Sequence, residues 1–238
     1  MARHGSSILA VVPARGGSKG IPRKNLCKIE GQSLVERAAR VANALPWLDA
    51  RVLSTDDVEI AEEGRRCGLA VPFMRPADLA SDQATGVAAW RHAWLATEAA
   101  LGRTFDCSVL LQPTSPLREA MDVERTFDAM MAGGHQAAAT VSRVPGHYTP
   151  EKLLTLDEGR LSFLHPEGAA HSNRQGIPAY YTRNGLCYAA RREAIVDRQE
   201  IVETDCAAVV FDGFVANIDD PIDLEIAQLF AGRSTRSS

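Results

Sequence analysis

The sequence contains no apolar run of the roughly 18 residues that a membrane-spanning helix requires, although 45% of its 238 residues are apolar. Its first seven residues, MARHGSS, lack the apolar core of a signal peptide. A chain of this length can bury about 70% of its unfolded surface, so disorder is not expected. These features predict a globular protein that is located in the cytoplasm and has no membrane partner.

The sequence also lacks paired cysteines and an excess of positive charge. Its five cysteines are an odd number, widely spaced and without a C-x-x-C pair, which argues against a disulfide framework or a zinc site. The six histidines show no H-E-x-x-H spacing. The net charge is -4, whereas proteins that bind nucleic acid usually present a broad basic face. We therefore expect no nucleic-acid partner.

What the sequence does have is a regular alternation of short apolar runs with amphipathic helical segments. Ile8 to Val12 form a continuous aliphatic run, as in strands that are covered on both faces. Such alternation predicts an α/β fold with a mostly parallel sheet, helices on both faces, and ligands beyond the carboxyl ends of the strands. Strands are expected near residues 8–12, 50–56, 69–74, 107–111, 137–144, 184–190 and 206–211, and helices near 34–45 (capped by Ser33), up to Cys67, 87–101, 119–132, 191–198 and from Pro221.

Residues 144–181 interrupt this alternation. The triplet Asp157-Glu158-Gly159 separates two short apolar runs and predicts a β-hairpin. The segment is too small to hold a core of its own. We therefore expect a single domain, residues 1–238, with an inserted element at 144–181 that covers the active site, pairs with another subunit, or does both.

The first strand leads into a loop that is rich in glycine and positive charge. Between Arg15 and Lys28 the chain carries five cations and no acid. The loop fits neither G-x-G-x-x-G nor the Walker pattern, because Arg15 and Ser18 stand where those motifs need glycine. Its glycines would let backbone N–H groups approach a phosphate, and Arg15, Lys19 and Lys24 would add charge-assisted contacts. The alternative is a mobile solvated loop with incidental lysines.

The loop sequence VVPARGGSKGIPRKN resembles the opening signature of the acylneuraminate cytidylyltransferases, or CMP-sialic acid synthetases. The resemblance continues in the same order through STDD, RPADLASD, LLQPTSPLR, NRQGIP, RNGLCY and IDDPIDL, over about residues 8–227. It implies a three-layer αβα mononucleotide-binding (Rossmann-like) domain that dimerises through a small insertion. It also implies transfer of CMP from CTP to the anomeric hydroxyl of a 2-keto-3-deoxy sugar acid, with release of pyrophosphate.

Residue by residue, the resemblance implies that the amino-terminal loop holds the triphosphate and nucleoside, and that Arg75 with the turn SDQATG reads cytosine. Positioning and charge neutralisation carry most of the catalysis of phosphoryl transfer. We therefore predict Arg15, Lys24 and Asp219 as catalytic residues. The predicted nucleotide-binding residues are Ala14, Arg15, Gly16, Gly17, Lys19, Lys24, Asn25, Arg75, Asp82 and Thr85.

A magnesium ion is the expected cofactor, since this small, hard ion prefers a few carboxylates together with water and phosphate. Asp219 is the first candidate ligand. The family usually shows D-I-D here, but this chain has Asn217 in the first position. Asp220 either helps to bind the metal or caps the helix that begins at Pro221, and we favour the cap. Asp223 is a plausible supporting acid.

The acceptor sugar acid needs arginine for its carboxylate and polar groups at strand ends. Gln112, Thr114 and Ser115 follow an apolar strand and would face the ligand; turn chemistry beside Pro113 and Pro116 is the alternative for them. Asp56 follows another strand and would also face the ligand, with capping of the next helix as its alternative. The family places a second arginine at position 182, where this chain has threonine; the adjacent Arg183 would point to the opposite face of a strand. A related nonulosonic acid of the legionaminic or pseudaminic type is therefore attractive. The predicted acceptor-binding residues are Gln112, Thr114, Ser115, Arg174, Arg183, Asn184 and Tyr188.

Two other functions fit the same residues. A nucleotidyltransferase that acts on a sugar 1-phosphate would also surround a triphosphate with arginine and lysine, but it would need further cations for its acceptor. A nucleotide-sensing module without turnover is suggested by Asn217, where the family usually has an acid.

Overall fold

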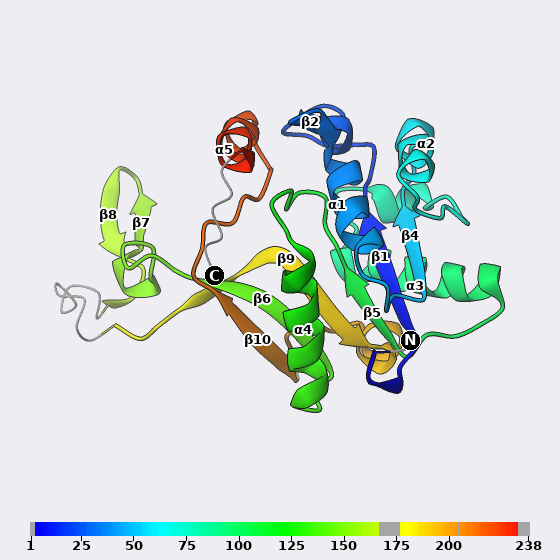
Figure 1. Cartoon of the computed structure of the whole chain (residues 1–238). Helices are drawn as coiled ribbons and strands as arrows, with labels where there is room; N and C mark the ends of the chain where they lie inside the picture. The colour runs from blue at the N-terminus through cyan, green and yellow to red at the C-terminus, as the bar shows by residue number, and fades with distance from the viewer. Residues whose placement is uncertain (1–2, 167–176, 204, 233–238) are drawn as a thin grey trace.

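The structure is a computed structural model that describes residues 3–166, 177–203 and 205–232. At its centre is a six-stranded sheet with the strand order β10-β6-β9-β5-β1-β4 (Figure 1). Five of these strands run parallel, and β9 is antiparallel to both of its neighbours. The mostly parallel sheet predicted from the sequence is therefore confirmed. The strands are β1 (Ile8–Pro13), β4 (Ala50–Ser54), β5 (Cys107–Leu110), β6 (Ala137–Arg143), β9 (Tyr181–Arg191) and β10 (Cys206–Phe211).

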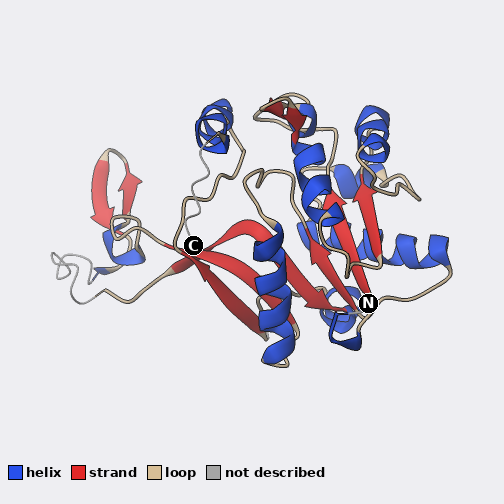
Figure 2. Cartoon of the chain, viewed as in Figure 1, coloured by secondary structure: helices blue, strands red, loops and turns tan. Residues whose placement is uncertain are grey.

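Helices cover both faces of the sheet (Figure 2). Ile8, Ala10 and Val12 of β1 belong to a core that includes side chains of α1, α2 and α4, whereas Leu9 and Val11 pack with α3 and η6 on the other face. Both faces of β1 are thus buried under helices, which gives the three αβα layers. The helices are α1 (Leu34–Asn43), α2 (Val58–Arg66), α3 (Gly86–Leu101), α4 (Ala120–Ala132), the short π-helix η6 (Glu193–Arg198) and α5 (Pro221–Ala231).

The ends of these helices follow from local side chains. Ser33 caps α1 as predicted, because its hydroxyl accepts a hydrogen bond from the Glu36 N–H at 3.0 Å. Gly102 ends α3 in the left-handed region, with φ of 64°, which is a common helix stop. Within the described residues, no helix is both long enough and apolar enough to cross a bilayer.

The strand expected at residues 69–74 is wrong. Only Ala70 forms a bridge, to Val52 of β4. Pro72 has no N–H to continue a ladder, and the chain turns so that the N–H of Arg75 donates to the carbonyl of Thr55 at 2.7 Å. This turn brings Arg75 to the carboxyl end of β4.

The hairpin predicted around Asp157-Glu158-Gly159 is present. Strands β7 (Leu154–Asp157) and β8 (Arg160–Phe163) pair antiparallel, and Glu158 and Gly159 both have positive φ, as a tight two-residue turn requires. The hairpin projects from the main sheet beyond the carboxyl end of strand β6 (Figure 1). The remaining short elements are η1 (Arg3–Gly5), η2 (Lys24–Leu26), β2 (Lys28–Ile29), β3 (Gln32–Ser33), η3 (Ala77–Ala80) and η4 (Pro150–Lys152).

Candidate active site

A cavity of about 490 Å³ opens at the carboxyl ends of β1 and β5. It brings together segments from both ends of the chain, which pack against each other through residues Gly20 and Asp219. Eleven of the predicted site residues line it: Arg15, Lys19, Lys24, Asn25, Arg75, Asp82, Thr85, Gln112, Thr114, Asp219 and Asp220. The structure thus gathers most of the predicted nucleotide and metal residues in one place.

A second cavity, of about 320 Å³, lies at the base of the inserted element. Among the described residues, Arg143 is the one charged residue in its lining. Four cations line the first cavity, and a triphosphate carries about four negative charges at neutral pH, so the first cavity suits such a ligand better.

Two glycines of the amino-terminal loop are required by close contacts within the protein. A Cβ on Gly20 would lie 2.3 Å from the carbonyl oxygen of Asp219, and one on Gly16 would lie 2.9 Å from Asp57. A Cβ on Gly17 would meet no atom within 4 Å. The N–H of Gly16 donates to the Asp56 carboxylate at 2.9 Å. These glycines therefore fit the loop against the rest of the site.

Asp56 does not cap the next helix. The carboxylate of Asp57 accepts from the Ile60 N–H at 3.0 Å and so caps α2. The sequence-based alternative for Asp56 is therefore wrong by one position. Asp56 instead holds the glycine loop through Gly16.

Lys24 joins the amino-terminal loop to the carboxyl-terminal segment. Its Nζ donates to the carbonyl of Ile218 at 2.6 Å and to Asp219 Oδ1 at 3.1 Å, and 14% of its side chain is exposed. The other oxygen of Asp219 accepts from the Asn217 amide at 2.9 Å. The Asn25 amide donates to the Arg15 carbonyl and fixes the base of the loop. The side chain of Asp219 is nevertheless 66% exposed.

Asp220 and Asp223 form a reciprocal cap at the start of α5. The Asp223 carboxylate accepts from the N–H groups of both Asp219 and Asp220. Asp220 also lines the cavity. Asp223 therefore orients the acidic segment through the backbone, and the exposed side chain of Asp219 borders the cavity.

Arg75 and Thr85 hold their places through bonds to neighbouring residues. The Arg75 guanidinium is buried and donates to the Ser54 hydroxyl at 3.0 Å and to the Ser54 carbonyl at 2.5 Å. Burial lowers the pKa of Arg75, and the nearby Asp56 opposes this effect. The Thr85 hydroxyl accepts from the Ala88 N–H and caps α3. Both residues still border the cavity.

Asp82 faces the cations of the glycine loop. Its two oxygens lie 2.9 Å from an Arg15 nitrogen and 2.7 Å from Lys19 Nζ. The hydrogen bond from Lys19, followed by that from Arg15, lowers the pKa of this carboxyl.

The predicted acceptor residues are divided by the structure. Gln112 and Thr114 line the cavity, but the Ser115 hydroxyl is buried and donates to the Gly185 carbonyl. The Asn184 side chain donates to the Ser142 hydroxyl and accepts from the Leu186 N–H.

Tyr188 lies in the core between β5 and β6, where burial raises its pKa. Arg183 is on the exposed part of β9, and Arg174 lies outside the described residues. Ala14, Gly16 and Gly17 belong to the loop but not to the lining of the cavity.

Arg118 is a residue that the sequence reasoning missed. It is buried, and its guanidinium donates to the carbonyls of Gln112, Gly185 and Leu186. These bonds join the end of β5 to an irregular stretch of β9, where the register shifts between Ala139 and Val141 of β6. The only signal in the sequence is an arginine at the end of the LLQPTSPLR motif.

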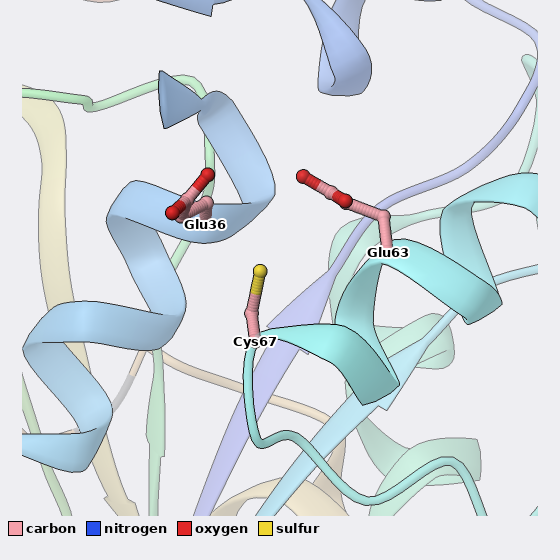
Figure 3. A group of neighbouring side chains, drawn as sticks. All are labelled: Glu36, Glu63 and Cys67. Carbon is pink, nitrogen blue, oxygen red and sulfur yellow. The ribbon is translucent and has the colours of Figure 1, made fainter. Parts of the chain in front are cut away.

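Three side chains on α1 and α2 also approach one another closely enough to hold a metal (Figure 3). They are Glu36, Glu63 and Cys67. Arg66 donates to both carboxylates at 2.8 to 2.9 Å and already supplies their counter-charge. Burial, and then Glu63, raise the pKa of the Cys67 thiol, which disfavours the thiolate that binds metals. This group is therefore an ion-pair cluster.

The chain is similar to known proteins over almost its whole length. The chain is 28% identical over 224 residues to the pseudaminic acid cytidylyltransferase of Campylobacter jejuni, covering 93% of this chain and 94% of that protein. It is 27% identical over 226 residues to the CMP-N,N'-diacetyllegionaminic acid synthase of Legionella pneumophila, with coverages of 93% and 94%.

A solved structure of CMP:2-keto-3-deoxy-manno-octonic acid synthetase complexed with CTP has the same fold. The TM-score is 0.70 at 17% identity, over 96% of this chain and 99% of that one. Residues 9–205 match the family model described as cytidylyltransferase. The chain is therefore a member of the cytidylyltransferase family, and so a nucleotidyltransferase.

Proposed function

We propose that the protein transfers CMP from CTP to the anomeric hydroxyl of a nonulosonic acid, a 2-keto-3-deoxy sugar acid. The observation that carries this proposal is the junction in the cavity between Lys24 of the cationic loop and Asp219 of the carboxyl-terminal segment, 3.1 Å apart. A cation for phosphate oxygens and a carboxylate for a metal thus stand side by side. This is the combination that transfer at an α-phosphorus requires.

In the proposed reaction, the sugar hydroxyl oxygen attacks the α-phosphorus of CTP and the bond to the β-phosphate oxygen breaks. Arg15 and Lys19 hold the β- and γ-phosphates, which leave as pyrophosphate. Lys24 stabilises the charge that develops on the α-phosphate oxygens. Arg75 and the adjacent turn hold the cytosine base, and the hydroxyl proton passes to solvent water as the new bond forms.

The donor set at Asp219 fits a magnesium ion. The carboxylate is exposed and lines the cavity, and Asp220 lies next to it. Magnesium prefers one or two carboxylates and completes its shell with water and phosphate oxygens. When bound here, it would neutralise phosphate charge. Asn217 would support the metal site indirectly, since its amide holds one oxygen of Asp219.

The nonulosonic acceptor is supported by the relatives and by residue 182. Relatives that match almost the whole chain are named for pseudaminic and diacetyllegionaminic acids, and this chain carries Thr182 at the position where sialic acid synthetases usually have an arginine. Gln112 and Thr114 face the cavity and are the proposed acceptor contacts within it.

We also propose that the hairpin joins two copies of the chain. Leu154 pairs with Phe163 and Leu156 with Leu161, so these four apolar side chains share one face of the ribbon, which remains exposed. A second copy would cover it. Leu156→Asp should convert the dimer to monomers in light scattering, whereas Thr155→Asp, on the polar face, should not. A wild-type monomer would refute the proposal.

The function is tested by mixing the protein with CTP, magnesium and a panel of sugar acids, and by measuring pyrophosphate release. We expect release with a nonulosonic acid and none after a chelator removes the metal. Release only with a sugar 1-phosphate would indicate the other type of nucleotidyltransferase. CTP binding without release on any acceptor would indicate a nucleotide sensor.

The same assay tests the residues. Lys24→Ala and Asp219→Ala should each lower turnover at least about a hundredfold, because each removes transition-state charge stabilisation worth a few kcal/mol. Lys28→Ala is the matched control, since Lys28 lies outside the cavity lining. A near-normal rate in either variant would remove that residue from the mechanism.

A further inference from the structure

The carboxylate of Asp82 makes the kind of contact that a phosphate group would make. One of its oxygens pairs with Arg15 and the other with Lys19, at 2.9 and 2.7 Å. Arg15 also donates to the Ala80 carbonyl, at 3.3 Å. Asp82 lies in the turn from Ser81 to Ala84, between η3 and the start of α3. Two cations from the glycine loop thus converge on one anion of the protein itself.

This pairing changes the charge that the cavity offers to a ligand. The lining contains four cations, Arg15, Lys19, Lys24 and Arg75, and three carboxylates, Asp82, Asp219 and Asp220. Asp219 pairs with Lys24, and Asp82 offsets one of the two positive charges of Arg15 and Lys19. A triphosphate and this carboxylate compete for the same donors, and like charges in one site repel each other.

The ion pairs of Asp82 with Arg15 and Lys19 are open to solvent, so a ligand can replace the carboxylate. The side chains of Lys19 and Asp82 are 80% and 46% exposed, and that of Arg15 is 33% exposed. Ion pairs that are open to water contribute little to stability. A pyrophosphate group carries more charge and more acceptor oxygens than one carboxylate, so it can displace Asp82 at small cost.

We infer that Asp82 is an intramolecular competitor of the phosphates: it occupies Arg15 and Lys19 when the site is empty, gives way to the β- and γ-phosphates of the nucleotide, and returns as pyrophosphate leaves. This inference rests on the proposed function. Asp82 thereby weakens the binding of both the triphosphate and the pyrophosphate, and it speeds product release.

The test measures the binding of CTP and of inorganic pyrophosphate, each with magnesium, by isothermal titration calorimetry. Asp82→Asn removes the competing charge and should bind both ligands about three- to tenfold more tightly, the range expected from two exposed ion pairs. Inhibition of turnover by added pyrophosphate should strengthen by the same factor. Asp82→Glu, which restores a carboxylate, should return both values towards wild type.

Asp78→Asn is the matched control. It removes the same charge from the same segment, but Asp78 is exposed and does not line the cavity. It should change both affinities by less than twofold. An equal gain in affinity in Asp78→Asn would show that any negative charge on this segment weakens binding, whether or not it contacts Arg15 and Lys19. That result would overturn the inference.

The outcomes also separate this inference from the proposed function. If the wild type binds CTP and pyrophosphate and Asp82→Asn binds them equally or more weakly, Asp82 contacts the ligand or its metal, and the competitor role is wrong. If the wild type binds neither ligand, the nucleotide site itself is wrong and both proposals fall.

Discussion

The two ends of helix α3 each carry a carboxylate paired with arginine, but the two pairs are built differently. Just before the helix, Asp82 is 46% exposed and contacts Arg15 and Lys19, whose side chains are 33% and 80% exposed. Near its end, Glu98 is 9% exposed and contacts Arg192 at 3.0 Å. Glu98 also accepts from the Trp94 indole N–H and the Phe105 backbone N–H.

The difference shows how burial decides the role of a charge. The donors around Glu98 are held by the core and the backbone, and the carboxylate is buried among them. A ligand from solution therefore cannot take the place of Glu98. The donors around Asp82 are open to water and to phosphate. Similar chemistry therefore stabilises the fold at one end of α3 and is available for exchange at the other.

The largest effect is expected from Glu98→Ala. It leaves buried donors without an acceptor and an arginine without its partner, which should cost about 3 kcal/mol and lower Tm by about 6–12 °C. Thermal denaturation measures this. Glu193→Ala is the control, because Glu193 is 59% exposed and its ion pair with Arg198 is long, at 3.4 Å. This variant should shift Tm by less than about 2 °C. Equal shifts in the two variants would erase the contrast.

Gly20→Ala should act on the cavity rather than on the core. The added Cβ would lie 2.3 Å from the Asp219 carbonyl and must push the acidic segment away from the loop. Displacement of about 1 Å can cost up to about a hundredfold in rate, so we expect turnover to fall about ten- to a hundredfold. Gly213→Ala, whose Cβ would meet only Phe211 at 3.8 Å, is the control. Full activity in Gly20→Ala would show that the junction tolerates movement.

The pH dependence of stability should sharpen the contrast further. Burial raises the pKa of Glu98, but the hydrogen bonds from Arg192 and Phe105 outweigh it, so the pKa is lower than the usual 4.5. A carboxyl with a lowered pKa stabilises the fold above its unfolded pKa and loses this contribution as the pH falls through its folded pKa. The Tm difference between wild type and Glu98→Gln should therefore be largest near pH 7 and smaller at pH 4. A difference that widens on acidification would contradict this assignment.

The smallest effect on stability is expected from Asp82→Asn. Its ion pairs are open to water, so Tm should change by less than about 2 °C even though phosphate binding changes. Differential scanning fluorimetry without ligand gives this value. A shift as large as that of Glu98→Ala would mean that the turn before α3 is part of the structural framework.

Much of the fold could be predicted because local patterns and packing agree. The aliphatic run Ile8–Val12 predicts a strand that is covered twice, and the structure buries its alternate residues in two cores. The hairpin turn and the Ser33 cap are also local features and were predicted correctly. The strand expected at residues 69–74 is not formed, because the chain turns away after Ala70 so that the N–H of Arg75 bonds to the carbonyl of Thr55. The local sequence does not reveal this contact.

The sequence predicted which residues form the candidate site, but not which of them contact one another. Loop cations and strand-end acids mark a nucleotide site in the sequence, and the structure gathers most of them around one cavity. The sequence gives no means of knowing that Asp82 meets Arg15 and Lys19, or that Arg118 donates to the carbonyls of Gly185 and Leu186, because these contacts join segments that are distant along the chain. The helix cap predicted at Asp56 is formed by Asp57 for a different, local reason: the geometry of one turn decides which carboxylate faces the helix.

The reversed direction of β9 has a mechanical consequence. Because β9 runs against its neighbours, Tyr181 at its start pairs with Arg143 at the end of β6. The chain therefore leaves β6 and enters β9 on the side of the sheet where β1 and β5 end beside the cavity. A displacement of the start of β9 would reach Gly185, which lies against the Gln112 side chain, along a single strand and without passing through the centre of the sheet.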